Sequence, residues 1–413
     1  MKIAILGGGL TGLIAGFRLS SDHKVILYEK NAEIGGLLSS YKRPGYSLER
    51  YYHHFFSSDT CLQGLCNRLG MSNEIAWLKG STGTYKNGAI FSLTTPIEII
   101  RYPHLTLTEK IRLALFTKRA KYLDVSALDT VSAEEYIRTN LGDGIYCSFF
   151  RPLLQSKFGV NAEKISAAWV VSRVAIRSDR GALGERLGYM KGGFSPLLEK
   201  IEESIVNNGG VIRTSTPVTC LIRKETGWQV NGEEFEVVIS TIAPGQLQNL
   251  GTDTPLPDIP YQGSACLTLA LTHEVTRGIY WINLYENAPY GAVIGHTCFA
   301  PFEWYNEHIV YLASYYTGDV KPDLKESMIN DFCSKFSVKP EEIIWAEIAV
   351  EPFAGPLYVT GYRKKMDDLS IPGLYIAGMF SPENYPERSM EGSVRAGFRI
   401  AEEINQLSTS REQ

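Results

Sequence analysis

Three glycines and one glutamate near the start of the chain have the spacing of a dinucleotide site. Gly7, Gly9 and Gly12 follow a short apolar run at residues 2–6 and open a helical pattern. The first glycine permits a tight turn, the second lets backbone N–H groups approach a diphosphate, and the third lets the helix pack on the strand. Glu29 ends a second apolar run, where a carboxylate accepts hydrogen bonds from a ribose and disfavours a 2′-phosphate. These residues predict a bound dinucleotide other than NADP.

A glycine doublet, Gly35-Gly36, follows and is not part of the ordinary NAD fingerprint. Together the two glycine motifs resemble the signature of the flavin amine oxidase superfamily, in which the doublet lets the chain pass close to FAD. In that family an arginine often follows the doublet and meets the diphosphate, whereas this chain has Leu37. The resemblance implies non-covalent FAD against Gly7, Gly9, Leu10, Thr11, Gly12, Glu29, Lys30, Gly35, Gly36 and Leu37.

Two later segments carry further pieces of this signature. Residues 190–244 contain a glycine pair, a helical pattern and two strand-like runs in the order that resembles protoporphyrinogen oxidases and phytoene desaturases, which implies that backbone at Val218 meets the adenine. Near the end, a buried strand stops at a glycine, and a last helix begins whose N-terminus would stabilise negative charge on reduced flavin. The family often has an acid at the position of Met379. The implied contacts in this segment are Gly378, Met379, Met390, Glu391 and Ser393.

The length of the chain, 413 residues, favours two lobes. We predict an α/β fold in which a two-dinucleotide-binding, Rossmann-like FAD domain carries an inserted α+β substrate domain. The FAD domain is expected to be discontinuous, formed by residues 1–80, 190–245 and 366–413. The substrate domain is expected to comprise residues 81–189, which are helix-rich, and 246–365, which are strand-rich. Short motifs at residues 151–168 and 356–361 extend the resemblance to protoporphyrinogen oxidases over nearly the full chain.

The most conspicuous titratable cluster is Glu49 to Phe56. In related flavoproteins a Gly-x-His motif lies near the flavin at this place; His53 matches its histidine and Tyr51 replaces its glycine. His53 is therefore the candidate catalytic residue, because a side chain with a pKa of about 6.5 can exchange a proton or donate to a flavin carbonyl. A structural hydrogen-bonding histidine is the alternative, and His54 is expected to have that role. Arg50 is expected either to bind an anionic substrate group or to form a surface ion pair.

Two groups of residues each have two interpretations. Residues 97–123 carry six Lys or Arg against two Glu, so a basic amphipathic helix there either rests peripherally on anionic lipid or presents a solvated face. A set of aromatic residues either lines a pocket for a flat or sugar-like ligand or packs on a twisted sheet. This set comprises Tyr280, Trp281, Tyr285, Tyr290, Trp304, Tyr305, Tyr311, Tyr315 and Tyr316.

Composition excludes several classes of partner. A net charge of −4 and a pI near 6.1 do not match a nucleic-acid-binding protein. The seven cysteines have no metal-ligand spacing, so we expect free thiols, no metal and a cytoplasmic protein. No apolar run is long enough to span a membrane, which leaves peripheral contact open.

The favoured function is that of an FAD-dependent oxidoreductase. Such an enzyme takes a hydride from a carbon of a small-molecule substrate and returns the electrons to oxygen, a quinone or another acceptor. The alternative is a non-redox flavin enzyme of the UDP-galactopyranose mutase type, acting on a sugar nucleotide, because residues 53–59 and the Tyr85-Lys86 turn resemble that family. A third possibility, a flavin-stabilised binding or scaffold protein, explains none of the flavin-facing features.

Overall fold

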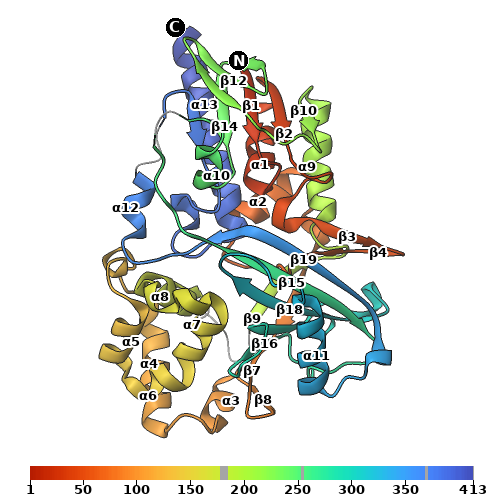
Figure 1. Ribbon diagram of the computed structural model, residues 1–413, viewed down its shortest axis with the longest axis vertical. Helices are drawn as coiled ribbons and strands as arrows, with labels where there is room; N and C mark the ends of the chain where they lie inside the picture. The colour runs from red at the N-terminus through yellow and green to blue at the C-terminus, as the bar shows by residue number, and fades with distance from the viewer. Residues whose placement is uncertain (177–184, 253–254, 368–370, 413) are drawn as a thin grey trace.

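The structure, a computed structural model, describes residues 1–176, 185–252, 255–367 and 371–412. The chain forms two lobes stacked along the long axis of the molecule, with both termini at the far end of the first lobe (Figure 1). The first lobe draws its central sheet from well-separated stretches of sequence. Within the described residues no helix is long and apolar enough to cross a bilayer.

The first lobe is built on a five-stranded parallel sheet in the order β10-β2-β1-β14-β20. Its central strands are almost entirely apolar and buried, as expected for a parallel sheet covered on both faces. The strand bounds are β1 Lys2–Leu6, β2 Lys24–Tyr28, β10 Val211–Arg213, β14 Val237–Ser240 and β20 Leu374–Ile376.

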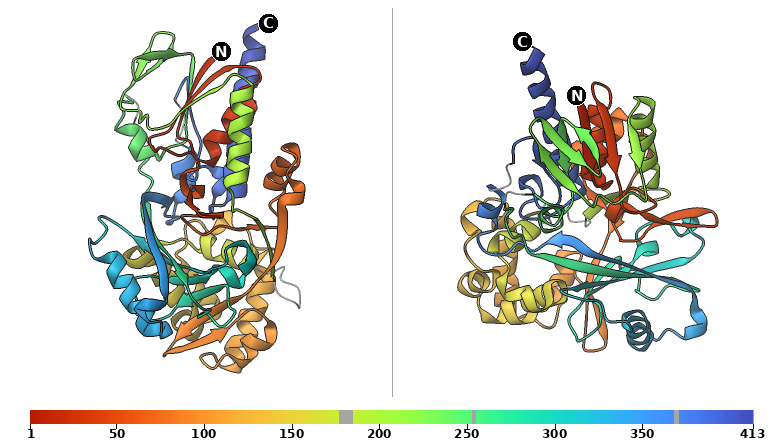
Figure 2. Two further views of the ribbon diagram at one scale, coloured as in Figure 1. Left: turned by 90° about the vertical axis from the view of Figure 1, so that its right-hand side faces the viewer. Right: turned by 45° about the horizontal axis from the view of Figure 1, so that its top comes forward.

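Alternation along β1 sends its side chains to two different layers. Ile3 and Ile5 pack against three helices that lie side by side on one face (Figure 2): α1 Leu10–Leu19, α9 Ser195–Asn207 and α13 Met390–Glu412. Ala4 and Leu6 belong to the core beneath an antiparallel meander on the other face. The meander consists of β11 Leu221–Lys224, β12 Gly227–Val230 and β13 Glu233–Phe235. The α/β fold predicted from the sequence is confirmed.

The second lobe contains a seven-stranded mixed sheet in the order β19-β15-β18-β17-β16-β7-β8. On β15, Cys266 and Ala270 face the first lobe, whereas Leu267 and Leu269 face α11 Leu324–Phe336. The strand bounds are β7 Thr82–Lys86, β8 Ala89–Ser92, β15 Tyr261–Leu271, β16 Trp281–Leu284, β17 Ala292–Gly295, β18 His308–Tyr316 and β19 Ile343–Pro356.

A helical cluster lies beside this sheet (Figure 1). Its core includes Phe150, Phe158 and Trp169. Its helices are α3 Pro96–Arg101, α4 Leu107–Ala120, α5 Ala133–Leu141, α6 Asp143–Ile145, α7 Arg151–Phe158 and α8 Ala167–Ile176. The remaining elements are α2 Thr60–Arg68, α10 Pro244–Gln248 and α12 Tyr362–Asp367, the hairpin of β3 Ser40–Arg43 and β4 Tyr46–Glu49, and a small sheet of β5 Phe55–Phe56, β6 Ile75–Gly80 and β9 Glu185–Met190.

Candidate functional site

The glycine turn after β1 has the geometry that its sequence predicts. Gly7 has a φ of +104°, a conformation that side chains disfavour. A Cβ on Gly12 would overlap the carbonyl oxygen of Gly7, so only glycine lets α1 start this close to the strand. Gly9 caps α1 in an extended conformation, and a Cβ built there meets nothing within 4 Å. The space beside Gly9 at the N-terminus of α1 is therefore open, as close approach of an anion there would require.

The glycine doublet packs directly on this turn. The Gly35 N–H donates to the Gly8 carbonyl at 2.7 Å, and Gly9 and Gly35 form an isolated parallel bridge. Gly35 and Gly36 have φ values of +109° and +57°. The half-buried Leu37 lies in the short turn that follows. Two glycine motifs that are separate in sequence thus form one surface.

Glu29 joins this surface at the end of β2. It is buried, and its Oε2 and Oε1 accept hydrogen bonds from the Gly8 and Asn31 N–H groups, each at 2.8 Å. The Glu29 carbonyl accepts from the Thr216 N–H at 2.8 Å, which brings the segment leading to the half-buried Val218 alongside. Glu29 therefore fixes the glycine turn, and its carboxyl group lies at the end of β2, the position at which the glycine motif predicts a ribose contact.

Replacing Glu29 with alanine should weaken FAD retention by about 1–3 kcal/mol, because ribose hydroxyls lose a charged acceptor and the Gly8 N–H loses its partner. Equilibrium binding followed by flavin fluorescence measures this change. The control is Glu33→Ala, a change to an exposed acid in the following loop. Equal FAD affinity in the two variants would remove Glu29 from the site.

The C-terminal segments are held together by a buried asparagine. The Asn384 side chain donates to the Gly378 carbonyl at 3.1 Å and accepts from the Ser389 N–H at 2.9 Å. The Ser389 hydroxyl accepts from the Gly392 N–H at the start of α13. Asn384 thus fixes the end of β20 against the N-terminus of α13. Sequence reasoning missed this residue, although it stands between the two motifs that it joins.

The predicted contacts at this end have different environments. Glu391 is turned towards α2, where its carboxylate accepts from the Cys61 and Leu62 N–H groups at 3.0 and 2.9 Å. Its side chain therefore caps α2. Met390 is buried, the Ser393 hydroxyl donates to the Ser389 carbonyl, and the Met379 carbonyl accepts from Tyr358. Lys30, which follows Glu29, is exposed.

His53 is half-buried and hydrogen-bonded to its own chain. Its Nδ1 lies 2.7 Å from the Tyr51 carbonyl, which can only accept, so Nδ1 carries the proton. Burial lowers the pKa of His53 to about 4, with the Tyr51 bond opposing and the charge of Arg388 adding to the effect. At neutral pH His53 is uncharged, and its Nε2 can only accept. His54 bonds the Tyr280 hydroxyl at 2.8 Å within an aromatic cluster.

Glu49 is a buried residue whose hydrogen bonds join three separate segments of the chain, a role that sequence reasoning did not assign. Its carboxylate accepts from the Tyr189 hydroxyl at 2.6 Å and the Phe194 N–H at 2.8 Å. Its backbone carbonyl accepts from the Tyr311 hydroxyl on the sheet of the second lobe. Burial raises the pKa of Glu49 to about 7, although the hydrogen bonds from Tyr189 and Phe194 oppose the rise. Arg50, by contrast, forms an ion pair with Glu33 at 3.1 Å near the surface.

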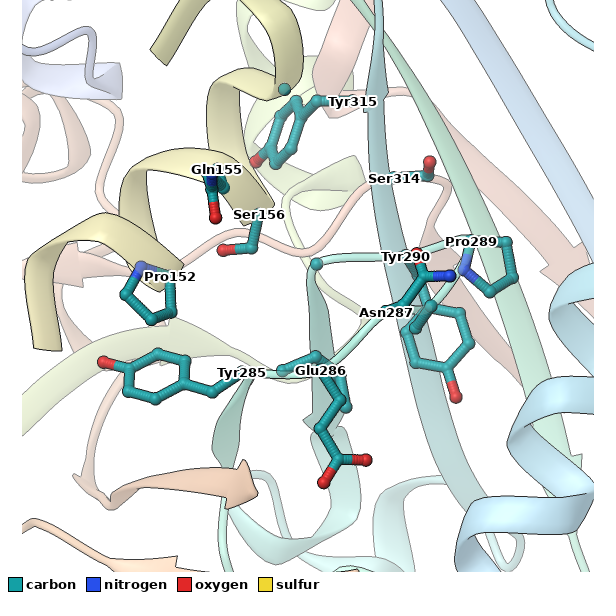
Figure 3. Close-up of a pocket in the computed structure, with 14 residues that line it drawn as sticks. Pro152, Gln155, Ser156, Tyr285, Glu286, Asn287, Pro289, Tyr290, Ser314 and Tyr315 are labelled. Atoms are coloured by element: carbon teal, nitrogen blue, oxygen red, sulfur yellow. The ribbon is translucent and has the colours of Figure 1, made fainter. Parts of the chain in front are cut away.

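A cavity of about 510 Å³ lies between α7 and the sheet of the second lobe (Figure 3). Gln155 and Ser156 of α7 line it together with Tyr285, Tyr290 and Tyr315. The other aromatic residues singled out in the sequence do not line this cavity, and Tyr280, Tyr305 and Tyr311 pack in the core. The Tyr315 hydroxyl lies 2.9 Å from the hydroxyl of Tyr52, the residue that precedes His53 in the sequence. Among the described residues no cluster of His, Cys, Asp or Glu could hold a metal ion.

The chain matches known proteins along most of its length. The family model of flavin containing amine oxidoreductases matches residues 10–405. Coproporphyrinogen III oxidase of Staphylococcus aureus is 21% identical over 265 residues, which cover 55% of this chain and 56% of that protein. A 4,4′-diapophytoene desaturase of the same species is 42% identical over 50 residues, 12% of this chain and 10% of that protein. The matched stretches thus span about half or less of these relatives.

Two solved structures have closely similar folds. A protoporphyrinogen oxidase-type protein from Exiguobacterium sp. 255-15 has a TM-score of 0.77 at 19% identity and covers 98% of both chains. Reduced UDP-galactopyranose mutase has a TM-score of 0.77 at 18% identity and covers 98% of this chain and 96% of its own. With the glycine surface described above, these matches make FAD the cofactor. The chain therefore belongs to the flavin containing amine oxidoreductase family, a family of FAD-dependent oxidoreductases.

Proposed function

We propose that the protein oxidises a small-molecule substrate by taking a hydride from a substrate carbon. The observation that carries this proposal is the convergence of both glycine motifs and Glu29 at the N-terminus of α1, within a chain that matches the oxidoreductase family over residues 10–405. When bound, FAD supplies the hydride acceptor, flavin N5. The substrate and the final acceptor, whether oxygen, a quinone or another molecule, are open.

We assign cofactor binding to residues 1–80, 190–245 and 366–413 and substrate binding to residues 81–189 and 246–365. The diphosphate is held by backbone from Gly7 to Gly12 and by the doublet Gly35-Gly36, flanked by Lys30 and Leu37. Glu29 meets the ribose, and backbone at Val218 meets the adenine. At the flavin end, Gly378, Met379, Met390 and Ser393 contribute backbone, whereas Glu391 acts by fixing α2.

His53 is the candidate catalytic residue, but its role does not include proton donation at neutral pH. Its Nδ1–H donates to the Tyr51 carbonyl, and its pKa lies at about 4. The ring is therefore neutral at pH 7, and Nε2 has no proton to donate. We infer that Nε2 accepts a hydrogen bond from the substrate and orients the carbon that loses the hydride. Proton storage at pH 7 is not part of this role.

The mutase alternative is not separated from the oxidase by fold, because the two solved neighbours have the same TM-score. The oxidase interpretation draws its support from the family match and from the coproporphyrinogen oxidase relative. The two chemistries make opposite demands on the flavin. A redox enzyme starts from oxidised flavin, whereas the mutase type uses reduced flavin as a nucleophile.

An anaerobic screen tests the proposed function directly. Oxidised holoenzyme is mixed with candidate metabolites without oxygen, and flavin absorbance is recorded over one turnover. A substrate should bleach the flavin, and a dissolved acceptor should restore the colour. A metabolite that is converted while the flavin stays oxidised would argue against hydride transfer.

We also propose that the protein is cytoplasmic and makes peripheral contact with anionic lipid through α3 and α4. Five large apolar side chains there are 50–67% exposed: Ile97, Ile100, Leu107, Ile111 and Leu115. Exposed cations flank them at Arg101, Arg112, Lys118 and Arg119. The two acids, Glu98 and Glu109, are used in the capping boxes of the helices, so the face is predominantly basic. This combination fits a negatively charged lipid surface.

Co-sedimentation with vesicles should show binding to phosphatidylcholine containing phosphatidylglycerol and weak binding to phosphatidylcholine alone. Combining Leu107→Ser, Ile111→Ser and Leu115→Ser should weaken binding at least about tenfold, since three apolar side chains no longer leave water. Val206→Ser, a change at an exposed apolar residue elsewhere, is the control. Equal binding by the triple variant, or a stable dimer that covers this face, would contradict lipid contact.

A further inference from the structure

Arg388 lies between the two lobes. It lies two residues before α13, and its guanidinium fills the space where a side chain on Gly355 of β19 would stand. Its charge acts on the pKa of His53 and opposes the burial-driven rise in the pKa of Tyr52. Arg388 therefore lies near the candidate catalytic histidine, at the end of the long sheet that faces the first lobe.

No carboxylate within the described part of the chain forms an ion pair with Arg388. Its neighbour Glu387 instead pairs with Arg173 at 3.0 Å and Lys157 at 3.4 Å. Burial lowers the pKa of Lys157 to about 7; the Glu387 charge opposes this shift, and the charges of Arg173 and Arg388 add to it. Among the described side chains of this cluster, Arg173 and Arg388 accompany the one carboxylate of Glu387, even with Lys157 neutral. These described side chains carry excess positive charge at a site that is partly shielded from water.

A second unmatched donor lies on the same face of the sheet. Gln262 of β15 is paired with Gly355, and paired residues of an antiparallel ladder place their side chains on one face. Gln262 is 2% exposed, and its Nε2 has no hydrogen-bond partner among the described residues. An unsatisfied buried donor is costly, and an acceptor bound beside Arg388 would satisfy it.

These donors connect to the cavity along β15. Ser264 lies two residues beyond Gln262, about 7 Å along the strand. Its ladder partner is Tyr315, which lines the cavity (Figure 3) and reaches the Tyr52 hydroxyl. The cavity wall and the strand that carries Gln262 are thus adjacent parts of one sheet. A protonated amine would be repelled beside Arg388, so the charge disfavours amine substrates despite the family name.

We propose that Arg388 and Gln262 bind an anionic group of the substrate, a carboxylate or a phosphate. The planar guanidinium suits two parallel hydrogen bonds to either group, and the Gln262 amide adds a third donor. This inference rests on the proposed function, because it assigns the cavity and His53 to the active site. Its readout is independent of turnover.

The test titrates oxidised holoenzyme with inorganic phosphate and, separately, with acetate at constant ionic strength, and follows the visible spectrum of bound FAD. Saturable perturbation by phosphate alone would identify a phosphate-type group, and perturbation by acetate alone would identify a carboxylate. Arg388→Met should weaken binding of the anion that perturbs the spectrum at least about tenfold. Arg388→Lys should weaken its binding less, because a cation remains. Arg395→Met, at an exposed arginine of α13, is the control.

Gln262→Met gives a second, independent test of the anion site. It should weaken anion binding several-fold while the melting temperature of the ligand-free holoenzyme stays equal or rises, because a buried donor without a partner is removed. Three results would overturn the proposal: no saturable binding of either anion, unchanged binding in Arg388→Met, or loss of FAD as the sole effect of that change. None of these results bears on flavin bleaching by a substrate, so redox chemistry is judged separately.

Discussion

Changing Gly12 to alanine is expected to give a protein that retains no FAD and is destabilised by about 1–3 kcal/mol or more. The added methyl group would overlap the carbonyl oxygen of Gly7, and neither backbone can move without displacing the start of α1 from β1. Urea unfolding and FAD content after gel filtration measure the two effects. Gly64→Ala in α2 is the matched control, because a Cβ there meets nothing within 4 Å.

Gly9→Ala separates cofactor binding from folding. The backbone at Gly9 has a φ of −73°, which alanine adopts, and its Cβ would meet no protein atom within 4 Å. The protein should therefore fold with near wild-type stability. The methyl group should keep the diphosphate away from the backbone and weaken FAD binding at least about tenfold. Full FAD binding by Gly9→Ala would contradict the placement of the diphosphate at this turn.

Glu49→Gln is expected to remove a large pH dependence of stability. The pKa of Glu49 is raised by burial to about 7, so the folded state holds this proton more tightly than the unfolded chain. Its stabilising contribution is complete below about pH 4.5 and is lost as pH rises to about 7, a change of roughly 3 kcal/mol. The difference in unfolding free energy between wild type and variant should shift by about that amount over this window.

The measurement is urea unfolding of both proteins at several pH values between about 4.5 and 8. Glu234→Gln, at an exposed glutamate on β13, is the control and should follow the wild-type curve. If Glu49→Gln keeps the wild-type pH dependence, the Glu49 carboxyl is ionised throughout and burial does not govern its titration.

The parts of the fold that could be predicted are those determined by local sequence. Lys2–Leu6, the glycine turn, and Lys24–Tyr28 followed by Glu29 coincide with observed elements, because apolar runs and glycine spacing act over a few residues. The stretch expected to be helix-rich also contains β7 and β8. Strand β7 is fixed by pairing with β16, about 200 residues away, which no local pattern reports, and β8 is fixed by pairing with β7.

For the candidate site, the sequence indicates the conformation of the glycine turns but not the distant partner that a side chain binds. Gly9 was singled out by the spacing of the first glycine motif, and Gly35 by the resemblance of the doublet to the family signature. Glu391 was expected at the cofactor, yet its carboxylate caps α2, more than 300 residues earlier in the chain. Arg388 lacks a sequence signal altogether, because its position depends on the absence of a side chain at Gly355 in another strand.

The central claim is that substrate electrons pass through FAD to an acceptor, and the most direct test is an electron count during steady turnover. Holoenzyme, a substrate identified by bleaching and a two-electron dye acceptor are combined without oxygen. Product and reduced dye are then measured together. The account predicts one reduced dye per oxidised product and no turnover when the acceptor is omitted. Isomerisation of a sugar nucleotide by the reduced enzyme, with no net consumption of acceptor, would contradict it.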